Sequence, residues 1–121
     1  MKATELQCYD IVNVDGKPVM IYGVMARMDR VYDTMTNDIS AKRCYPIPLT
    51  AEILEKNGWK EAQFWHEYQD GKNTIQSCLL DMRGIINGVE IQHFKCEYVH
   101  QYQHLLRLCG LNDLADNIQI E

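Results

Sequence analysis

The sequence lacks several features that mark common functional classes. Its longest nearly apolar run, residues 19–26, is far short of the roughly 20 residues needed to span a bilayer. None of its five cysteines belongs to a C-x-x-C pair, and no charged start leads into an apolar signal segment. The seven glycines stand singly, so no Gly-rich phosphate loop is present. We therefore expect one cytoplasmic globular domain, residues 1–121, with reduced cysteines and no membrane association.

The sequence also lacks a basic excess. Residues 1–45 contain as many bases as acids, whereas residues 46–121 contain six bases and eleven acids and carry the whole net charge of −5. Proteins that bind nucleic acid usually present a basic stripe, because neutralising phosphates supplies most of their affinity. Nucleic-acid binding is therefore disfavoured for the chain as a whole. A weak local site on the N-terminal lobe stays open, formed by Arg27, Arg30, Lys42 and Arg43.

Turn signals in residues 1–45 predict a small antiparallel lobe. Asp15-Gly16 readily adopts the positive φ angles of a two-residue hairpin turn. The unbroken apolar run at 19–25 predicts a central strand covered on both faces, and Gly23 within it marks a bulge or sharp bend. These features are typical of a curled, SH3-like lobe. The strands predicted here are 9–14, 17–26 and 30–35.

Residues 46–121 predict a second antiparallel sheet with helices, which makes the fold class α+β. Thr50 as N-cap and Gly58 as the residue after the C-cap delimit a short helix. Asn87-Gly88 is a second hairpin turn. A longer helix at 97–109 has an apolar face and an opposite polar face. The strands predicted here are 64–68, 75–80, 82–86 and 89–94, and the polar helix face comprises His100, Gln103, His104 and Arg107.

Three segments resemble a family of small Bacteroidetes proteins that is common in prophages and mobile elements. They read E-L-Q at 5–7 before Y-D-I-V at 9–12, P-I-P-L-T-A-E-I-L at 46–54 before G-W at 58–59, and Y-V-H-Q-Y-Q at 98–103. The sequence departs from the family pattern at 7–10, where Q-C-Y-D replaces R-x-G-N, and at His104, where Asn is usual. The resemblance implies a fold and a phage or mobile-element context, without an assigned chemistry.

His100 and His104 have the spacing that places two imidazoles on one face of a helix, as in zinc peptidases. In those enzymes a glutamate follows the first histidine and acts as general base. Gln101 stands at that place and cannot accept a proton, and a structural zinc would need further ligands from elsewhere. We therefore expect polar-face histidines here, with no metal and no cofactor.

Cys96 is the one cysteine placed for the lowered thiol pKa that a nucleophile requires, because it follows Lys95 and precedes a helix. One alternative is accordingly a small enzyme or small-ligand binder, with a site between the lobes formed by His66, Cys96 and His100. No signature of a catalytic cysteine surrounds Cys96, so we expect a protein without catalytic activity.

Aromatic residues near the middle of the chain favour a binding function. On a strand, Phe64 and Trp65 take opposite faces, so we expect one in the core and Trp65 exposed, unless both cover the short helix. Tryptophan is frequent in protein interfaces. We therefore predict a phage- or mobile-element-associated accessory protein that binds a protein partner, with self-association left open. The predicted binding residues are Trp65, His100, Gln103, His104 and Arg107.

Overall fold

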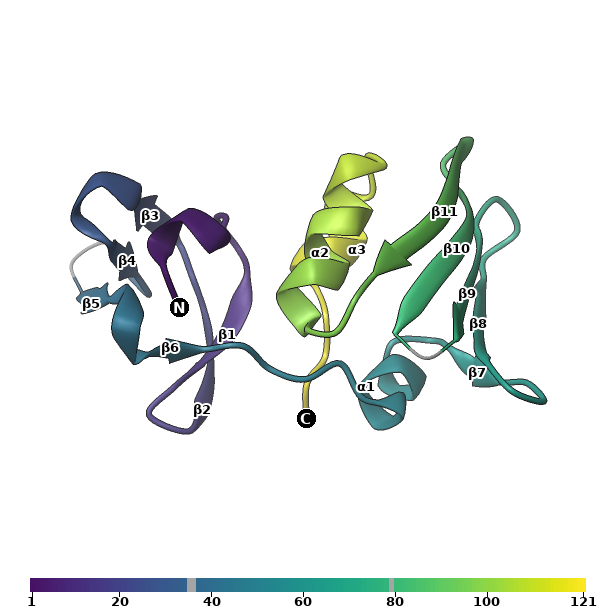
Figure 1. The fold of residues 1–121 in the computed structure, drawn as a ribbon, viewed down its shortest axis with the longest axis horizontal. Helices are drawn as coiled ribbons and strands as arrows, with labels where there is room; N and C mark the ends of the chain where they lie inside the picture. The colour runs from purple at the N-terminus through teal and green to yellow at the C-terminus, as the bar shows by residue number, and fades with distance from the viewer. Residues whose placement is uncertain (35–36, 79) are drawn as a thin grey trace. The chain divides into compact units, whose positions relative to one another are not determined.

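The computed structural model describes residues 1–34, 37–78 and 80–121 (Figure 1). It contains helices together with antiparallel sheets, so the fold is α+β, as the sequence predicts. The chain divides into two compact units. The first contains residues 1–47 and 98–100, and the second contains residues 48–97 and 101–121. The single domain expected from chain length stays a prediction.

The first unit consists of short antiparallel strands. Its strands in the described residues are β1 (Ile11–Val14), β2 (Lys17–Met20), β3 (Gly23–Met25), β4 (Arg30–Tyr32), β5 (Asp38–Ser40) and β6 (Cys44–Tyr45). One sheet has the order β2-β1-β6 and another the order β3-β4-β5. Asp15 and Gly16 have φ angles of +52° and +81°, which confirms the hairpin turn predicted between β1 and β2.

The strand predicted at 17–26 is divided into β2 and β3. Between them, the Ile21 amide donates to the Asp10 carbonyl at 2.8 Å, and the Tyr22 amide donates to the Tyr32 carbonyl at 2.7 Å. The chain thus passes from one sheet to the other at this bend. The prediction that the run is covered on both faces is wrong, because Ile21 is buried while Tyr22 is 56% exposed. The SH3-like description of this lobe stays a prediction.

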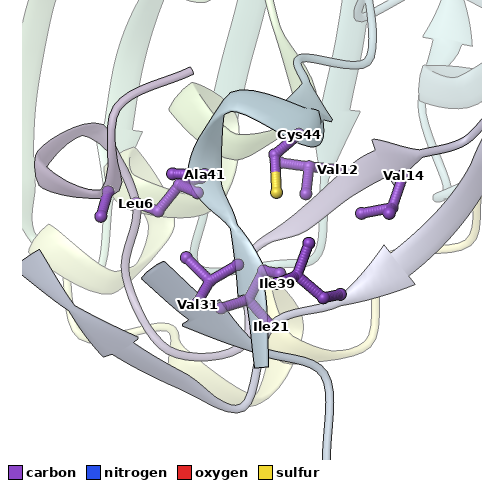
Figure 2. Packing of buried hydrophobic residues seen from close by; sticks show 9 residues of the cluster. Leu6, Val12, Val14, Ile21, Val31, Ile39, Ala41 and Cys44 are labelled. Carbon is purple, nitrogen blue, oxygen red and sulfur yellow. The ribbon is translucent and has the colours of Figure 1, made fainter. Parts of the chain in front are cut away.

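Aliphatic side chains form the core of the first unit (Figure 2). The cluster comprises Ala3, Leu6, Val12, Val14, Ile21, Val31, Ile39, Ala41 and Cys44. Within the described part of this unit, the buried cluster contains no aromatic ring. The tyrosines of these strands therefore lie outside the core.

The second unit is built on a single antiparallel sheet. Its strands in the described residues are β7 (Lys60–Glu61), β8 (His66–Gln69), β9 (Thr74–Cys78), β10 (Asp81–Ile86) and β11 (Val89–Lys95), in the order β11-β10-β9-β8-β7. Asn87 and Gly88 have φ angles of +50° and +78°, which confirms the second predicted hairpin turn. Met35, at the predicted end of the third strand, and Leu79, within the strand predicted at 75–80, lie outside the described residues.

A β-bulge interrupts the pairing of β10 with β11. The register shifts between Met82 and Gly84, and His93 opposite them has a φ angle of +59°. Gly84 has a φ angle of +149°, and a Cβ there would lie 2.0 Å from the Thr74 carbonyl oxygen. Only glycine fits this close approach of two backbones.

The short helix α1 (Ala51–Lys56) has the ends that the sequence predicts. The Thr50 hydroxyl accepts from the Ile53 amide at 3.3 Å. At the other end, the Trp59 amide donates to the Leu54 carbonyl at 3.1 Å, and Gly58 has a φ angle of +91°. This is the hydrogen-bonding pattern of a glycine-terminated helix.

Two buried aromatic rings pack together in the second unit. Trp59 and Tyr102 are both buried, and the Trp59 indole Nε1–H donates to the Tyr102 hydroxyl at 3.1 Å. Their rings meet edge to face with centroids 5.8 Å apart. Tyr102 lies on α2 (Val99–Leu108), and a last helix, α3 (Asn112–Asp116), follows it.

Candidate functional site

The predicted polar face of α2 is not a free surface, because α3 lies against it. Gln103 is fully buried, and its side-chain amide donates to the Ala115 carbonyl at 3.0 Å. Arg107 is half-buried and forms an ion pair with Asp116 at 3.3 Å. The prediction that Gln103 lies on an exposed contact surface is therefore wrong. The polar residues of this face satisfy the carbonyl and carboxylate groups of the chain's own C-terminal segment.

The two predicted histidines of this face are buried to different extents. His100 is 6% exposed, and its ring stacks on Tyr98 with centroids 5.9 Å apart. The exposed position predicted for His100 is therefore wrong as well. His104 is half-buried. Among residues 1–34, 37–78 and 80–121, no group of three or more His, Cys, Asp or Glu side chains is arranged to hold a metal ion.

Cys96 lies in an environment that disfavours the thiolate. It is 1% exposed, and burial together with the nearby Asp81 carboxylate raises the pKa of its thiol to about 12. A nucleophilic cysteine needs the opposite shift, which a neighbouring cation would supply. The prediction that Cys96 is placed for a lowered thiol pKa because it follows Lys95 is therefore wrong. Lys95 is exposed at the end of β11 and is not among the groups that shift this pKa. Cys96 is a packing residue.

Acids neutralise part of the basic patch suggested for the first unit. Arg30 forms an ion pair with Asp38, and Arg43 forms one with Asp15. Counterion release on phosphate binding requires bases that are not already paired. Only Arg27 and Lys42 of the suggested patch are left without an ion pair in the described part of the chain. This arrangement weakens the nucleic-acid alternative.

A different surface emerges at the turn between β7 and β8. The Ala62 amide donates to the Trp65 carbonyl at 2.7 Å and closes the turn. Trp65 is half-buried, and its indole Nε1–H donates to Glu67 Oε1 at 2.6 Å. Phe64 is 84% exposed. The prediction that Trp65 is the exposed aromatic is thus wrong: β8 begins at His66, so strand alternation does not apply to Phe64 and Trp65.

A hollow of about 340 Å³ lies beside this turn. Its surface is more polar than apolar. Phe64, Leu80 and Leu54 supply the apolar part, and His66 on its wall contacts Glu55 at 3.5 Å. Leu80 is itself 38% exposed. We call Phe64, Leu80 and this hollow the Phe64 surface. Glu61 also lines the hollow, so its rim carries negative charge.

A larger hollow, of about 570 Å³, lies over β9, β10 and β11. Polar side chains on its walls include Gln76, Arg83, Glu90 and Gln92. Ile85, which is exposed, and Ile91 also line it. Sequence reasoning missed both hollows, because each depends on which residues face outward at a turn or bulge.

Comparison of the chain with protein-family models, with curated proteins and with solved structures returned no match. None of the helices formed by the described residues is both long enough and apolar enough to cross a membrane.

Proposed function

We propose that the chain is a non-enzymatic accessory protein that acts by binding another protein through the Phe64 surface. The observation that carries this proposal is the 84% exposure of Phe64 beside a hollow that Leu54 and Leu80 also line. A large apolar ring held in water costs free energy, and partner binding recovers it. The turn that presents Phe64 is closed by a backbone hydrogen bond, so little order has to be gained on binding.

The charges around the hollow indicate the charge of the partner. Glu61 lines it and Glu55 contacts its wall through His66. A partner that packs an apolar side chain on Phe64 and places a lysine or arginine in the largely polar hollow matches both features. The net negative charge of residues 46–121 likewise favours a positively charged partner.

The biological setting of this proposal is a phage or mobile element in Bacteroidetes. The support for it is the resemblance of the three sequence segments at 5–12, 46–59 and 98–103. The proposed role needs no catalytic group, and the raised pKa of Cys96 argues against the cysteine-based alternative.

Quantitative affinity capture from the native host tests the proposal. The bait is compared with its Phe64→Ala variant and with Leu108→Ala, which removes another exposed apolar side chain of the second unit. We expect at least one protein that wild type and Leu108→Ala retain and that Phe64→Ala loses. Direct titration of that purified protein should then show binding at least about tenfold weaker for Phe64→Ala. Equal capture by all three baits would contradict the proposal.

A further inference from the structure

The hollow over β9, β10 and β11 lies on the face of the sheet that points away from its buried side chains. On β10, Met82 and Ile86 are buried, whereas Arg83 and Ile85 are exposed, as the alternation of a strand requires. Arg83 and Ile85 both line the hollow. Its volume of about 570 Å³ lies in the range of sites for small ligands. We call it the Arg83 hollow.

The β-bulge between β10 and β11 opens into this hollow. Gly84 and His93, the two residues of the bulge with positive φ angles, both line it. The His93 ring is held by Asp81, with Nδ1 and Oδ2 2.9 Å apart. Bulges redirect side chains and are frequent beside functional sites, and strained backbone is concentrated there as well. The irregular pairing of the sheet therefore coincides with its hollow.

Two opposite charges on the walls of the hollow are not neutralised by the protein. Arg83 and Glu90 both line it, and both are exposed. Within residues 1–34, 37–78 and 80–121, neither forms an ion pair. The Gln92 side-chain amide donates to Glu90 Oε1 at 2.9 Å, but an amide is neutral and leaves the negative charge in place. Each charge is therefore available to a ligand.

An aliphatic side chain lies between these two charges. Ile85 pairs directly with Glu90 across the sheet, and Arg83 precedes Ile85 by two residues on the same face. Diagonal neighbours of this kind stand about 7–8 Å apart at the backbone. Ile85 is 52% exposed. The floor of the hollow thus presents a cation, an aliphatic group and an anion in succession.

We propose that the Arg83 hollow binds a small zwitterion with an aliphatic side chain, the chemistry shared by an aliphatic amino acid and a short aliphatic peptide. The ligand carboxylate accepts from the Arg83 guanidinium, whose fork of donors matches its two oxygens. The ligand ammonium donates to Glu90, and the aliphatic side chain packs on Ile85. A ligand with a single charge forgoes one of these contacts, so the two charges together select a zwitterion.

This proposal does not depend on the Phe64 surface. Ser77 lines the hollow beside Phe64, whereas Gln76, its neighbour on β9, lines the Arg83 hollow. Successive residues of a strand take opposite faces of the sheet. Phe64→Ala should therefore leave zwitterion binding unchanged.

The first test is titration of the ¹⁵N-labelled chain with leucine, followed by the amide chemical shifts of Arg83, Ile85 and Glu90. We expect saturable shift changes at millimolar concentration. Leucinamide lacks the carboxylate, N-acetyl-leucine lacks the positive charge, and glycine lacks the aliphatic side chain. Each of these three should bind at least about tenfold more weakly than leucine.

Arg83→Gln tests the carboxylate contact. It should bind leucine at least about tenfold more weakly than wild type and should bind leucine and leucinamide alike. The matched control is Lys95→Gln, which removes one positive charge from the exposed end of β11, outside the hollow. It should bind leucine as wild type does. If a variant does not give the amide spectrum of a folded chain, the leucine analogues on wild type still decide.

Glu90→Gln is the reciprocal test of the ammonium contact. It should bind leucine and N-acetyl-leucine alike, while it still distinguishes leucine from leucinamide. Each charged wall is then assigned to one end of the ligand, which a general loss of stability would not produce.

Leucyl-leucine distinguishes the two sources of this chemistry. Binding at least about tenfold tighter than that of leucine assigns the hollow to short peptides, and equal or weaker binding assigns it to the free amino acid.

Three outcomes would overturn the proposal. One is the absence of shift changes with leucine and with leucyl-leucine up to tens of millimolar. Another is equal binding of leucine and its two singly charged analogues by wild type. The third is an equal loss of binding in Arg83→Gln and Lys95→Gln, which would reduce the effect of Arg83 to net charge.

Discussion

The cores of the two units differ in their aromatic residues. In the first unit, the described core is a cluster of aliphatic side chains, and Tyr9, Tyr22 and Tyr45 are exposed. In the second, Trp59 and Tyr102 are buried and hydrogen-bonded to each other. The exposed Phe64 of the second unit shows that burial, and not the unit, decides which aromatic side chains stabilise the fold.

The difference in burial separates aromatic residues that stabilise a unit from exposed aromatic residues that are available for binding. Trp59 also meets Tyr68 with ring centroids 6.0 Å apart, so it contacts rings on two elements. Tyr22 contacts the ring of Tyr9, which is itself exposed. Removing Trp59 should damage the second unit, and removing Tyr22 should leave the first one folded.

Trp59→Ala is expected to have the largest effect. It removes a buried ring and leaves a cavity, which costs about 3–5 kcal/mol in comparable sites. The measurement is urea unfolding followed by the emission of Trp65, which belongs to the second unit. Trp65→Phe, with unfolding followed by circular dichroism, is the control and should cost far less, because Trp65 is half-buried. Equal losses for both variants would show that Trp59 is not central.

Alkaline pH should destabilise the second unit through Cys96. Its folded-state pKa of about 12 lies above the ordinary value of 9.0, so its contribution is fully present below pH 9 and is lost as the pH rises towards 12. Between pH 9 and 11, the free energy of unfolding of Cys96→Ala should therefore fall by about 2–3 kcal/mol less than that of the wild type. Urea unfolding of both proteins at several pH values between 9 and 11 measures this difference. Parallel curves for the two proteins would contradict the assignment.

Burial also raises the pKa of Cys44 in the first unit, while the N-terminal ammonium and Arg43 oppose the shift. Cys44→Ala is therefore the matched variant for this comparison. It should change the alkaline dependence less than Cys96→Ala does.

Tyr102→Phe tests the buried hydrogen bond alone. It keeps the ring and removes the oxygen that accepts from Trp59 Nε1–H. A buried donor without a partner costs about 1–3 kcal/mol. The loss should appear in thermal unfolding, with the native circular dichroism spectrum unchanged. Wild-type stability in this variant would mean that the indole finds another acceptor.

Tyr22→Ala should have the smallest effect on stability. Tyr22 is 56% exposed and its ring is not part of the buried cluster, so the expected change is within about 0.5 kcal/mol. Amide hydrogen exchange of Val12 and Val31 measures the first unit directly. A large loss of amide protection in Tyr22→Ala would show that Tyr22 contributes to the packing of the first unit. Tyr22 would then resemble the buried Trp59.

Local chemistry predicted much of the fold correctly. The turns at Asp15-Gly16 and Asn87-Gly88 and both ends of α1 depend on neighbouring residues only, and all are confirmed. Gly23 marked the bend between β2 and β3, although the bend itself falls at Ile21 and Tyr22. These features are encoded within a few residues of chain.

The candidate site was harder to predict because it depends on distant segments. The helical periodicity of α2 identifies a polar face, but it does not reveal that α3 returns to cover Gln103. Strand periodicity assigned Phe64 and Trp65 to opposite faces, although both precede β8. The apolar run at 19–25 predicted a straight, buried strand and therefore did not predict that Tyr22 is exposed. A bend exposes side chains that a straight strand would bury.

The bulge in β11 has a consequence for the behaviour of the protein in concentrated solution. β11 is an edge strand, and an uninterrupted edge offers a row of backbone groups to the strand of another molecule. His93, with its φ angle of +59°, breaks that row within the strand. On the neighbouring strand β10, the register shift ends at Gly84. We therefore expect the bulge to hinder edge-to-edge pairing of the sheet with another molecule.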